Sequence, residues 1–293
     1  MNRNNKWVIG SFLLPAVILL IIFLIIPFFM AFGLSFTNSR LIGPRPTSFI
    51  GLLNFDKLLN DSLFWKGLKH NILYVAIVVP IQTSLALLLA ILVNQKIKFN
   101  KLFRTIYFIP TVTAMVAVSV IWSFLYHPSG VINSFLKFIS FGAFQGIDFL
   151  NNTTWAFPSI MIMSIWQGVG FQMLIFLAGL QDIPKVYYEA AEIDGAGTWE
   201  KFRHITLPQL KNTITFVVIS TTILAFRLFT QIKVMTNGGP QHSTHTVMLH
   251  IFNMGYKRLN IGYGSAITVV FFLIILTISL LQRNFLGEQR EVD

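Results

Sequence analysis

Residues Trp7–Phe32 read WVIGSFLLPAVILLIIFLIIPFFMAF, a run of 26 residues without a charged side chain. A helix needs about 20 mainly apolar residues to cross the hydrocarbon core of a bilayer. The apolar part of a secretory signal peptide is shorter, about 7–15 residues, and ends at small residues, whereas this run continues into Phe28, Phe29 and Phe32. We therefore expect an uncleaved membrane-spanning helix.

Five further stretches are long and apolar, and they do not alternate as the strands of a membrane barrel do. Hydrophobic residues make up 54% of the 293-residue chain and charged residues 11%, against about 25% charged residues in a soluble domain. The sequence thus predicts an all-α integral membrane protein with six transmembrane helices in a single domain, residues 1–293. The other expected spans are Asn71–Val93, Thr105–Tyr126, Trp155–Leu180, Ile214–Ile232 and residues 263–281.

Lysine and arginine are denser in alternate loops. With the N-terminus placed inside, the cytoplasmic segments hold 12 of these cations in 61 residues and the outer segments hold 9 in 99. Because cytoplasmic loops carry an excess of Lys and Arg, we expect both termini in the cytoplasm. The cluster Lys96, Lys98, Lys101 and Arg104 is expected to hold its loop against membrane lipid. A net charge of +11 in such short patches does not indicate a nucleic-acid partner.

The segment Gln181–Thr213, between the fourth and fifth expected spans, is unusually long and acidic for an inner loop. It holds five of the eleven acidic residues of the chain, namely Asp182, Glu189, Glu192, Asp194 and Glu200. Its local signals predict a helix–turn–helix, in which Asp182 and Thr198 cap two short helices. Gly195 and Gly197 permit the turn between them, and Pro208 interrupts the second helix before the fifth span.

Each of these two short helices has an apolar stripe. Val186, Ala190 and Ile193 share one face of the first helix, and Trp199, Phe202 and Ile205 share one face of the second. The interpretation as a helix resting on lipid stays open, but the acidic flanks are unfavourable beside anionic lipid. The pattern favours a protein partner with a groove.

The same segment resembles the EAA loop of membrane subunits of binding-protein-dependent ABC importers. The resemblance rests on Glu189-Ala190-Ala191, Gly195, Ile205 and Leu207-Pro208 at the spacing of that loop. Three further stretches resemble the maltose-type carbohydrate permeases. These importers have two paired permeases, and the stretch that begins at Thr236 resembles an outer loop found in the first of the two. The three stretches are Arg104-Thr105 with Tyr107-Phe108-Ile109-Pro110, Phe49-Ile50-Gly51-Leu52 with Asn54-Phe55, and Thr236-Asn237-Gly238-Gly239-Pro240 with Ser243-Thr244.

This resemblance implies a permease subunit of a type I sugar importer in the bacterial plasma membrane. The implied partners are a second homologous permease, two cytoplasmic ATPase subunits and an extracytoplasmic substrate-binding protein. The chain lacks a phosphate-binding loop with the Gly-x4-Gly-Lys-Ser/Thr pattern, so we expect no enzymatic activity and no cofactor. The implied ATPase-coupling residues are Glu189, Ala190, Ala191, Asp194, Gly195, Gly197, Ile205, Leu207 and Pro208.

The solute remains open between a sugar and a polyol, a glycerol phosphate, an amino acid or a peptide. Polar and aromatic residues within the expected spans are candidates for lining its pathway. The glutamines either bind solute hydroxyls or join helices, the tryptophans either stack on a sugar or anchor at the interface, and the arginine either faces the pathway or extends to the membrane surface. These residues are Gln82, Trp122, Trp166, Gln167, Gln172 and Arg227.

Two other interpretations are less favoured. An intramembrane hydrolase needs a nucleophile–base or paired-carboxylate set at membrane depth, but no expected span contains Asp, Glu or His. A stand-alone channel leaves the acidic helix–turn–helix unexplained. In the last outer loop, Gly238, Gly239 and Pro240 are candidates for docking the binding protein. We expect no carboxylate near His242, His245 and His250, and none of the three lies on a predicted rigid element, so we expect no metal site.

Overall fold

A computed structural model describes residues 3–42, 46–95 and 98–287. Within these ranges the regular elements are helices, apart from an isolated antiparallel bridge between Thr37 and Phe49. This confirms the all-α prediction. Lys96 of the expected lipid-anchoring cluster, and residues 1–2 and 288–293 at the ends of the chain, lie outside the described residues.

Within the described residues, five continuous helical stretches are long and apolar enough to cross a membrane. They coincide with five of the expected spans but have shifted ends: the second begins nine residues earlier than expected, and the last begins two residues earlier and ends five residues later. Their bounds are Phe12–Leu34, Ser62–Asn94, Ala156–Asp182, Lys211–Met235 and Ile261–Leu286.

The third expected span, Thr105–Tyr126, is a bent pair of helices rather than one continuous helix. Helices α5 (Asn100–Val112) and α6 (Met115–Leu125) meet at 98°. The intervening Thr113 has an extended backbone with ψ of 137°, and Pro110 in the last turn has no N–H to donate to the helix. The Thr113 hydroxyl donates to the Ile109 carbonyl at 3.0 Å, which satisfies one acceptor that the break releases.

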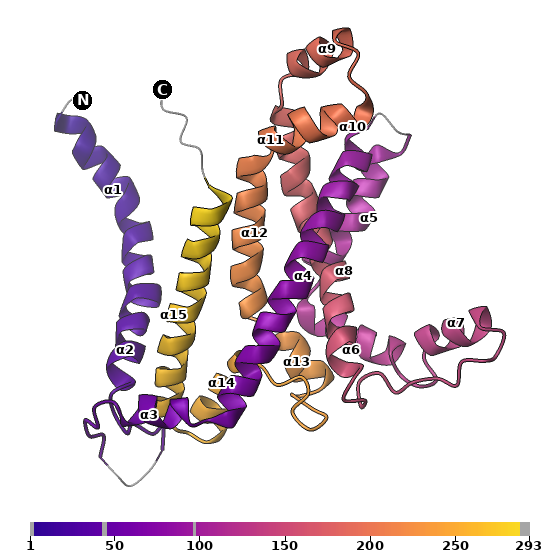
Figure 1. The fold of residues 1–293 in the computed structure, drawn as a ribbon. Coiled ribbons are helices and arrows are strands. Elements are labelled where there is room, and N and C mark those ends of the chain that lie inside the picture. Colours follow the sequence, from indigo (N-terminus) through magenta and orange to yellow (C-terminus); the bar gives the residue numbers. More distant parts are fainter. Residues whose placement is uncertain (1–2, 43–45, 96–97, 288–293) are drawn as a thin grey trace. The chain divides into compact units, whose positions relative to one another are not determined.

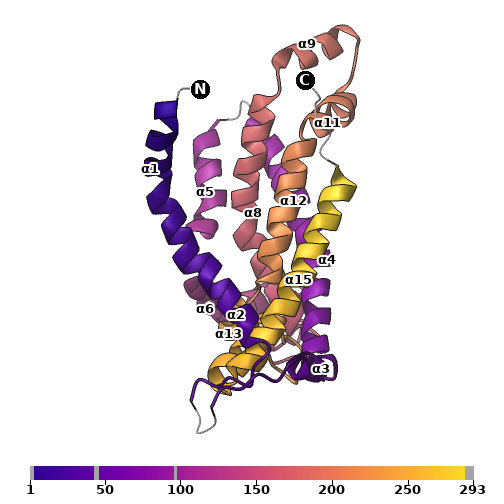
Figure 2. The same ribbon diagram turned by 90° about the vertical axis from the view of Figure 1, so that its left-hand side faces the viewer.

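The chain divides into two compact units, of which the second comprises Trp65–Leu249 and Ile275–Asp293. In this unit α5 packs along α8, and α12 packs on the same helix (Figure 1), an arrangement that Figure 2 shows from the side. A Cβ added to Gly170 of α8 would lie 2.0 Å from the Tyr107 carbonyl oxygen, so α5 reaches α8 only because this residue is glycine. The helices within the unit are α5, α6, α7 (Val131–Ile139), α8 (Ala156–Asp182), α9 (Lys185–Ile193), α10 (Thr198–Lys201), η2 (Phe202–Thr206), α11 (Leu207–Gln209), α12 (Lys211–Phe226) and α13 (Thr230–Met235).

Two apolar clusters form the core of the second unit. One joins α4 (Ser62–Asn94) and α8 to the segment after α8, through side chains such as Ala90, Phe176 and Leu210. The other joins the opposite part of α4 to α8 and to the α12–α13 region, through side chains such as Tyr74 and Ile232. The same packed helices border a polar cavity.

The first unit comprises Met1–Phe64 and His250–Ile274. Its loop after α2 is held by the buried Asn54, whose side-chain amide donates to the carbonyls of Ser35 and Thr37 at 2.9 and 2.8 Å. Its helices are α1 (Arg3–Leu20), η1 (Ile21–Ile25), α2 (Ile26–Leu34), α3 (Leu53–Leu59) and η3 (Asn253–Lys257); α4 (Ser62–Asn94), α14 (Val247–Phe252) and α15 (Ile261–Leu286) contribute to both units.

Candidate functional site

A cavity of about 480 Å³ in the second unit is bordered by α4, the α5–α6 break, α8, α12 and α13. Its polar lining consists of amides and hydroxyls with one cation, and no carboxylate is among its described lining residues. Such a lining can donate and accept hydrogen bonds, which suits a ligand rich in hydroxyl groups. The polar side chains are Tyr74, Gln82, Thr111, Ser164, Gln167, Gln172, Ser220, Thr221, Arg227, Thr230 and Gln231.

Four of the six pathway candidates come together in this cavity, three glutamines and the arginine. Gln82 extends from α4 to the backbone of α8 at Gly168. This contact is possible because Gly168 has no side chain: a Cβ there would lie 2.5 Å from the Gln82 Nε2 atom. Gln167 donates to the Pro110 carbonyl at 3.4 Å, and its own backbone carbonyl accepts from the Thr111 hydroxyl at 3.0 Å. Gln167 therefore supports the end of α5 as well as lining the cavity.

Gln172 is the most deeply buried of these glutamines. Its Nε2 atom donates to the Thr221 hydroxyl at 2.6 Å, while its Oε1 atom accepts no hydrogen bond from the described residues. A buried amide oxygen without a donor is unfavourable by about 1–3 kcal/mol. The cavity thus contains a buried acceptor that a ligand hydroxyl can satisfy.

Arg227 lies where α12 ends, and residues 227–229 separate α12 from α13. Its backbone N–H donates to the Leu224 carbonyl at 3.1 Å, and its side chain lines the cavity. The neighbouring Gln231, on α13, is buried and also lines the cavity. Sequence reasoning did not select Gln231, Ser220 or Thr221, although all three lie within seven residues of Arg227.

The two tryptophans among the pathway candidates lie outside the polar cavity. Trp122 and Trp166 pack against each other with ring centroids 5.4 Å apart. They line a separate apolar groove of about 490 Å³ beside the α5–α6 break. Their position favours an anchoring role over contact with solute in the cavity.

Helices α9, α10, η2 and α11 form a helical elbow, residues 185–209, at one end of α8 and α12 (Figure 1). The Tyr188 hydroxyl and the Thr206 hydroxyl are hydrogen-bonded at 2.9 Å, and Lys201 pairs with Glu192 at 2.7 Å. These contacts join the two arms of the elbow. Because Tyr188 and Ile205 pack against the apolar core below, the elbow is continuous with the helices that border the cavity.

The two helices predicted in this segment are present, but their caps differ from the prediction. Asp182 is the last residue of α8, and Pro184 is the N-cap residue of α9. Gly197 rather than Thr198 is the N-cap residue of α10, and its N–H donates to the Glu200 carboxylate at 2.7 Å. A capping residue has non-helical backbone angles. Asp182 does not cap α9 because α8 continues through Asp182.

Of the two glycines predicted to form the turn, Gly195 has a φ of +79° that favours glycine. Gly197 has an ordinary φ of −73°, so its conformation does not require glycine.

The face of the elbow that points away from the core is apolar and acidic. Val186, Ile193 and Trp199 are exposed, Ile193 to 87%. Among the predicted coupling residues, Glu189 and Ala190 are exposed on α9 and Ala191 is half-buried. The remaining ones lie at the α9 end (Asp194), in the turn (Gly195 and Gly197), against the core (Ile205) and on α11 (Leu207 and Pro208).

The loop after α13 is tied to the end of the helices opposite the elbow. Lys66 donates to the Gln241 carbonyl at 2.9 Å, and the Thr244 hydroxyl donates to the Gly239 carbonyl at 2.9 Å. Gly238 is buried with a φ of +89°, while Gly239 and Pro240 are half-buried. Gly238 therefore shapes the loop, whereas Gln241 and His242 are exposed at its tip.

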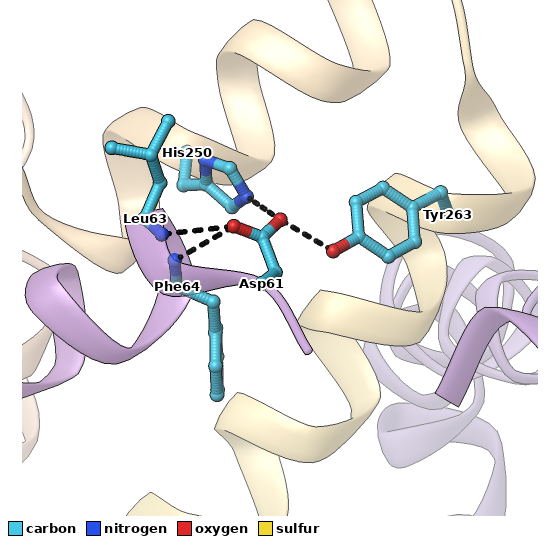
Figure 3. Close-up of polar contacts among 5 residues, drawn as sticks. All are labelled: Asp61, Leu63, Phe64, His250 and Tyr263. Carbon is cyan, nitrogen blue, oxygen red and sulfur yellow. Dashed lines mark hydrogen bonds and ion pairs between the residues drawn. The ribbon is translucent and has the colours of Figure 1, made fainter. Parts of the chain in front are cut away.

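A polar cluster that sequence reasoning missed lies in the first unit (Figure 3). The Asp61 carboxylate caps α4, because its Oδ1 atom accepts from the N–H groups of Leu63 and Phe64 at 2.9 and 3.2 Å. Its Oδ2 atom accepts from the Tyr263 hydroxyl at 2.6 Å and contacts His250 Nε2 at 3.0 Å. The expectation that no carboxylate lies near His250, and that it lies on no helix, is therefore wrong: Asp61 is 189 residues away in sequence, and His250 lies on α14.

The charges of this cluster follow from its surroundings. Burial raises the pKa of Asp61, but the Tyr263 hydroxyl, the His250 ring and the Phe64 N–H together lower it below its ordinary value. Burial lowers the pKa of His250 more than Asp61 raises it. At neutral pH the carboxylate is therefore ionised and the imidazole neutral, so His250 Nε2–H donates to Asp61.

We expect Asp61→Asn to reduce the free energy of unfolding by about 1–3 kcal/mol at pH 7, because buried donors lose their charged acceptor. The lowered pKa of Asp61 means that its contribution is present above the unfolded-state pKa of about 3.9. It is lost as the pH falls through the folded-state pKa. Thermal unfolding in detergent, compared between the two proteins across pH, measures both effects.

The matched control for this prediction is Asp56→Asn, since Asp56 is exposed on the neighbouring α3. Its unfolding midpoint is expected to equal that of the unchanged protein. Equal midpoints for Asp61→Asn and the unchanged protein at pH 7 would contradict the role assigned to Asp61.

Comparison with known proteins relates this arrangement to one family. A family profile described as "Binding-protein-dependent transport system inner membrane component" matches residues 82–288. A probable ABC transporter permease protein of Pyrococcus horikoshii is 35% identical, over 95% of this chain and 96% of that protein. The lactose transport system permease protein LacF of Rhizobium radiobacter is 33% identical, over 95% of this chain and 92% of that protein. A chain in the crystal structure of a bacterial alginate ABC transporter, in complex with alginate pentasaccharide-bound periplasmic protein, has a TM-score of 0.82 at 23% identity, over 96% and 94%.

The apolar helices and the polar cavity between them define an integral membrane permease. This chain belongs to the family of binding-protein-dependent transport system inner membrane components. Membership confirms that it is a multi-pass transport subunit and not an enzyme, as the residues of the EAA-like loop indicated. The alginate transporter, at 23% identity, shows a shared fold.

Proposed function

We propose that this chain forms half of the membrane pathway of an ATP-driven sugar importer. A second homologous permease forms the other half, two cytoplasmic ATPase subunits supply energy, and an extracytoplasmic binding protein delivers the solute. The observation that carries this proposal is the exposed elbow, which is packed onto the same helices that border a polar cavity. All 293 residues act as one permease domain in this proposal.

The elbow faces the cytoplasm and is the contact with the ATPase. The cation counts support this orientation, because Lys and Arg are denser in residues 181–213 and the other segments that it assigns to the cytoplasm. An apolar stripe flanked by carboxylates suits a groove on a protein whose rim carries cations. The exposed Glu189 makes a charged hydrogen bond to an arginine of the ATPase, and the small Ala190 and Ala191 permit close approach.

Energy passes from the elbow to the cavity by direct packing. The elbow contacts the core cluster that includes α8 residues such as Phe176, and the same helix carries Gln172 into the cavity. Because packed interiors deform little, movement of the elbow with an ATPase cleft moves the cavity wall. ATP hydrolysis on the partner thereby opens the cavity to one side of the membrane and then to the other.

The cavity is the site through which the solute passes. Amide and hydroxyl side chains match the hydroxyl groups of a carbohydrate, and the buried Gln172 oxygen gains a donor when a hydroxyl lies beside it. A carbohydrate also agrees with the names of the lactose permease relative and the alginate transporter. Arg227 favours a second class of solute, an acidic or phosphorylated sugar derivative, because it places a cation in the lining.

The loop from Thr236 to Thr246 is the docking surface for the binding protein. It lies at the end of the helices opposite the elbow, where its tip residues Gln241 and His242 are exposed. Gly238 and the Thr244 hydroxyl give the loop a fixed shape, which reduces the conformational entropy lost on docking.

Copurification tests the proposal most economically. A tagged chain is purified in mild detergent from cells that express its native transporter genes. The expected result is co-elution with a second permease and an ATPase subunit, and sugar-dependent ATP hydrolysis by reconstituted complexes once the binding protein is added. Elution of the chain alone, with no ATPase in crosslinked or uncrosslinked samples, would refute it.

A further inference from the structure

We propose that α7, together with Phe141, is an interfacial helix that lies in the headgroup–acyl boundary of the membrane. It is at the end of the membrane-spanning helices opposite the elbow, and its partner is the phospholipid surface. This inference goes beyond transport itself and does not depend on which solute is carried.

The position of α7 is fixed by its own loop. Five residues, 126–130, separate it from α6, and Figure 1 shows it running across rather than along α8. A Cβ on Gly130, its N-cap residue, would lie 2.5 Å from the Phe124 carbonyl oxygen, so the turn between α6 and α7 is close. The buried Asn133 donates to the His127 and Ile147 carbonyls, both at 2.9 Å, and accepts from the Ile147 N–H at 2.8 Å.

The opposite side of α7 is a continuous apolar surface. Val131, Phe135, Phe138 and Ile139 follow helical spacing and are all exposed. Phe138 is 80% exposed, and Phe141, just after the helix, is fully exposed. Contiguous apolar surfaces of this kind on soluble proteins mark interaction sites. None of these side chains offers a hydrogen-bonding group, which a protein interface would normally contain.

The charge of the segment fits phospholipid. Lys137 is exposed, and the sequence from His127 to Ile147 contains no acidic residue. A shallow hollow of about 720 Å³ is lined by Lys137 together with Phe138, Ile139 and Phe141. A cation beside aromatic side chains accommodates a lipid phosphate and the first part of its acyl chains.

Anchoring α7 has a consequence for the cavity. α7 fixes the end of α6, and α6 packs against α13, which carries the cavity residue Gln231. A membrane-bound α7 therefore holds this wall of the cavity at a constant depth while the elbow moves.

The absence of cysteine from the chain permits a direct test. Phe138→Cys introduces one thiol on the apolar side of α7, and Gln145→Cys introduces one at an exposed polar position in the loop after α7. Each variant carries a nitroxide label in the complete transporter, assembled with cysteine-free partner subunits in phosphatidylethanolamine–phosphatidylglycerol vesicles. Accessibility to oxygen and to a water-soluble nickel chelate then reports the surroundings of the label, and uptake is measured in the same vesicles.

The label at position 138 is expected to be accessible to oxygen, shielded from the chelate, and ~5–10 Å inside the interface, while the label at 145 contacts the chelate. Equal access of the chelate to both labels would overturn the proposal. A label at 138 that is immobilised and shielded from both reagents would also overturn it, since a protein partner then covers α7. Neither result depends on uptake, so failure of this inference is distinguishable from failure of the transport proposal.

Discussion

Glu189→Lys is expected to abolish solute uptake and uptake-coupled ATP hydrolysis without changing the amount of chain in the membrane. Glu189 is exposed on α9, so its replacement removes no packing contact from the core. A charged hydrogen bond to the ATPase contributes about 1.5–3 kcal/mol, and reversing the charge replaces this attraction by repulsion. Uptake and ATP hydrolysis by reconstituted vesicles measure the loss, and immunoblotting of membranes measures insertion.

Asp182→Lys is the matched control for this charge reversal. Asp182 is also exposed and acidic but is the last residue of α8, outside α9. A lysine there is favourable at the C-terminal end of a helix, so uptake is expected to stay normal. Normal uptake by the Glu189→Lys protein would contradict the proposal that Glu189 contacts the ATPase. Loss of uptake in both variants would show that the effect is a general response to charge.

Ser220→Trp is expected to reduce uptake to the background of empty vesicles while the protein remains folded. Ser220 lines the cavity from α12, and its hydroxyl donates to the Phe216 carbonyl of its own helix at 2.7 Å. Its replacement therefore leaves no partner on another helix without a hydrogen bond, and the indole occupies space within the cavity. Radiolabelled sugar uptake measures transport, and the thermal unfolding midpoint measures folding.

Ile223→Trp provides the control for added bulk on α12. Ile223 is 38% exposed and is not among the cavity-lining residues, so uptake is expected to persist. If Ser220→Trp also transports at the normal rate, the cavity is not the pathway. If both variants lose uptake and unfold at lower temperature, the bulk of tryptophan rather than the cavity accounts for the result.

Much of the fold could be predicted because membrane-spanning helices leave a strong local signal. A segment that crosses the lipid needs apolar side chains, and its backbone must satisfy its hydrogen bonds without water, which favours a helix. Ala156–Asp182 is such a segment. The elbow was also predictable, since acidic residues, glycines and a proline interrupt that pattern. Gly195 has the positive φ that glycine adopts readily, as expected of a residue in the predicted turn.

The bend between α5 and α6 could not be predicted from hydrophobicity, because both halves are apolar. Its determinants are the extended Thr113 and the support that Gln167 gives to the Pro110 carbonyl. A proline within a membrane helix is compatible with either a kink or a continuous helix when neighbouring groups satisfy the freed carbonyls. The Gln167 contact comes from another helix and has no local signature.

The polar sites show the same division between local and long-range information. The glutamines and Arg227 were detectable because polar residues are rare within apolar runs, and four of them meet in one cavity. Asp61, His250 and Tyr263 come from distant parts of the sequence. No spacing rule relates such residues, so their association became evident only from the fold.

Photo-crosslinking from the elbow tests the central claim most directly. Ile193→Cys places the single thiol of the chain on the exposed stripe of α9, and a benzophenone maleimide attached there reacts with any neighbour. In the membrane-embedded transporter the predicted product is a covalent adduct with the ATPase subunit, whereas a label at Asp148→Cys, in the loop between α7 and α8, gives none. Adducts of position 193 with lipid alone, in preparations where the ATPase is bound and active, would contradict the account.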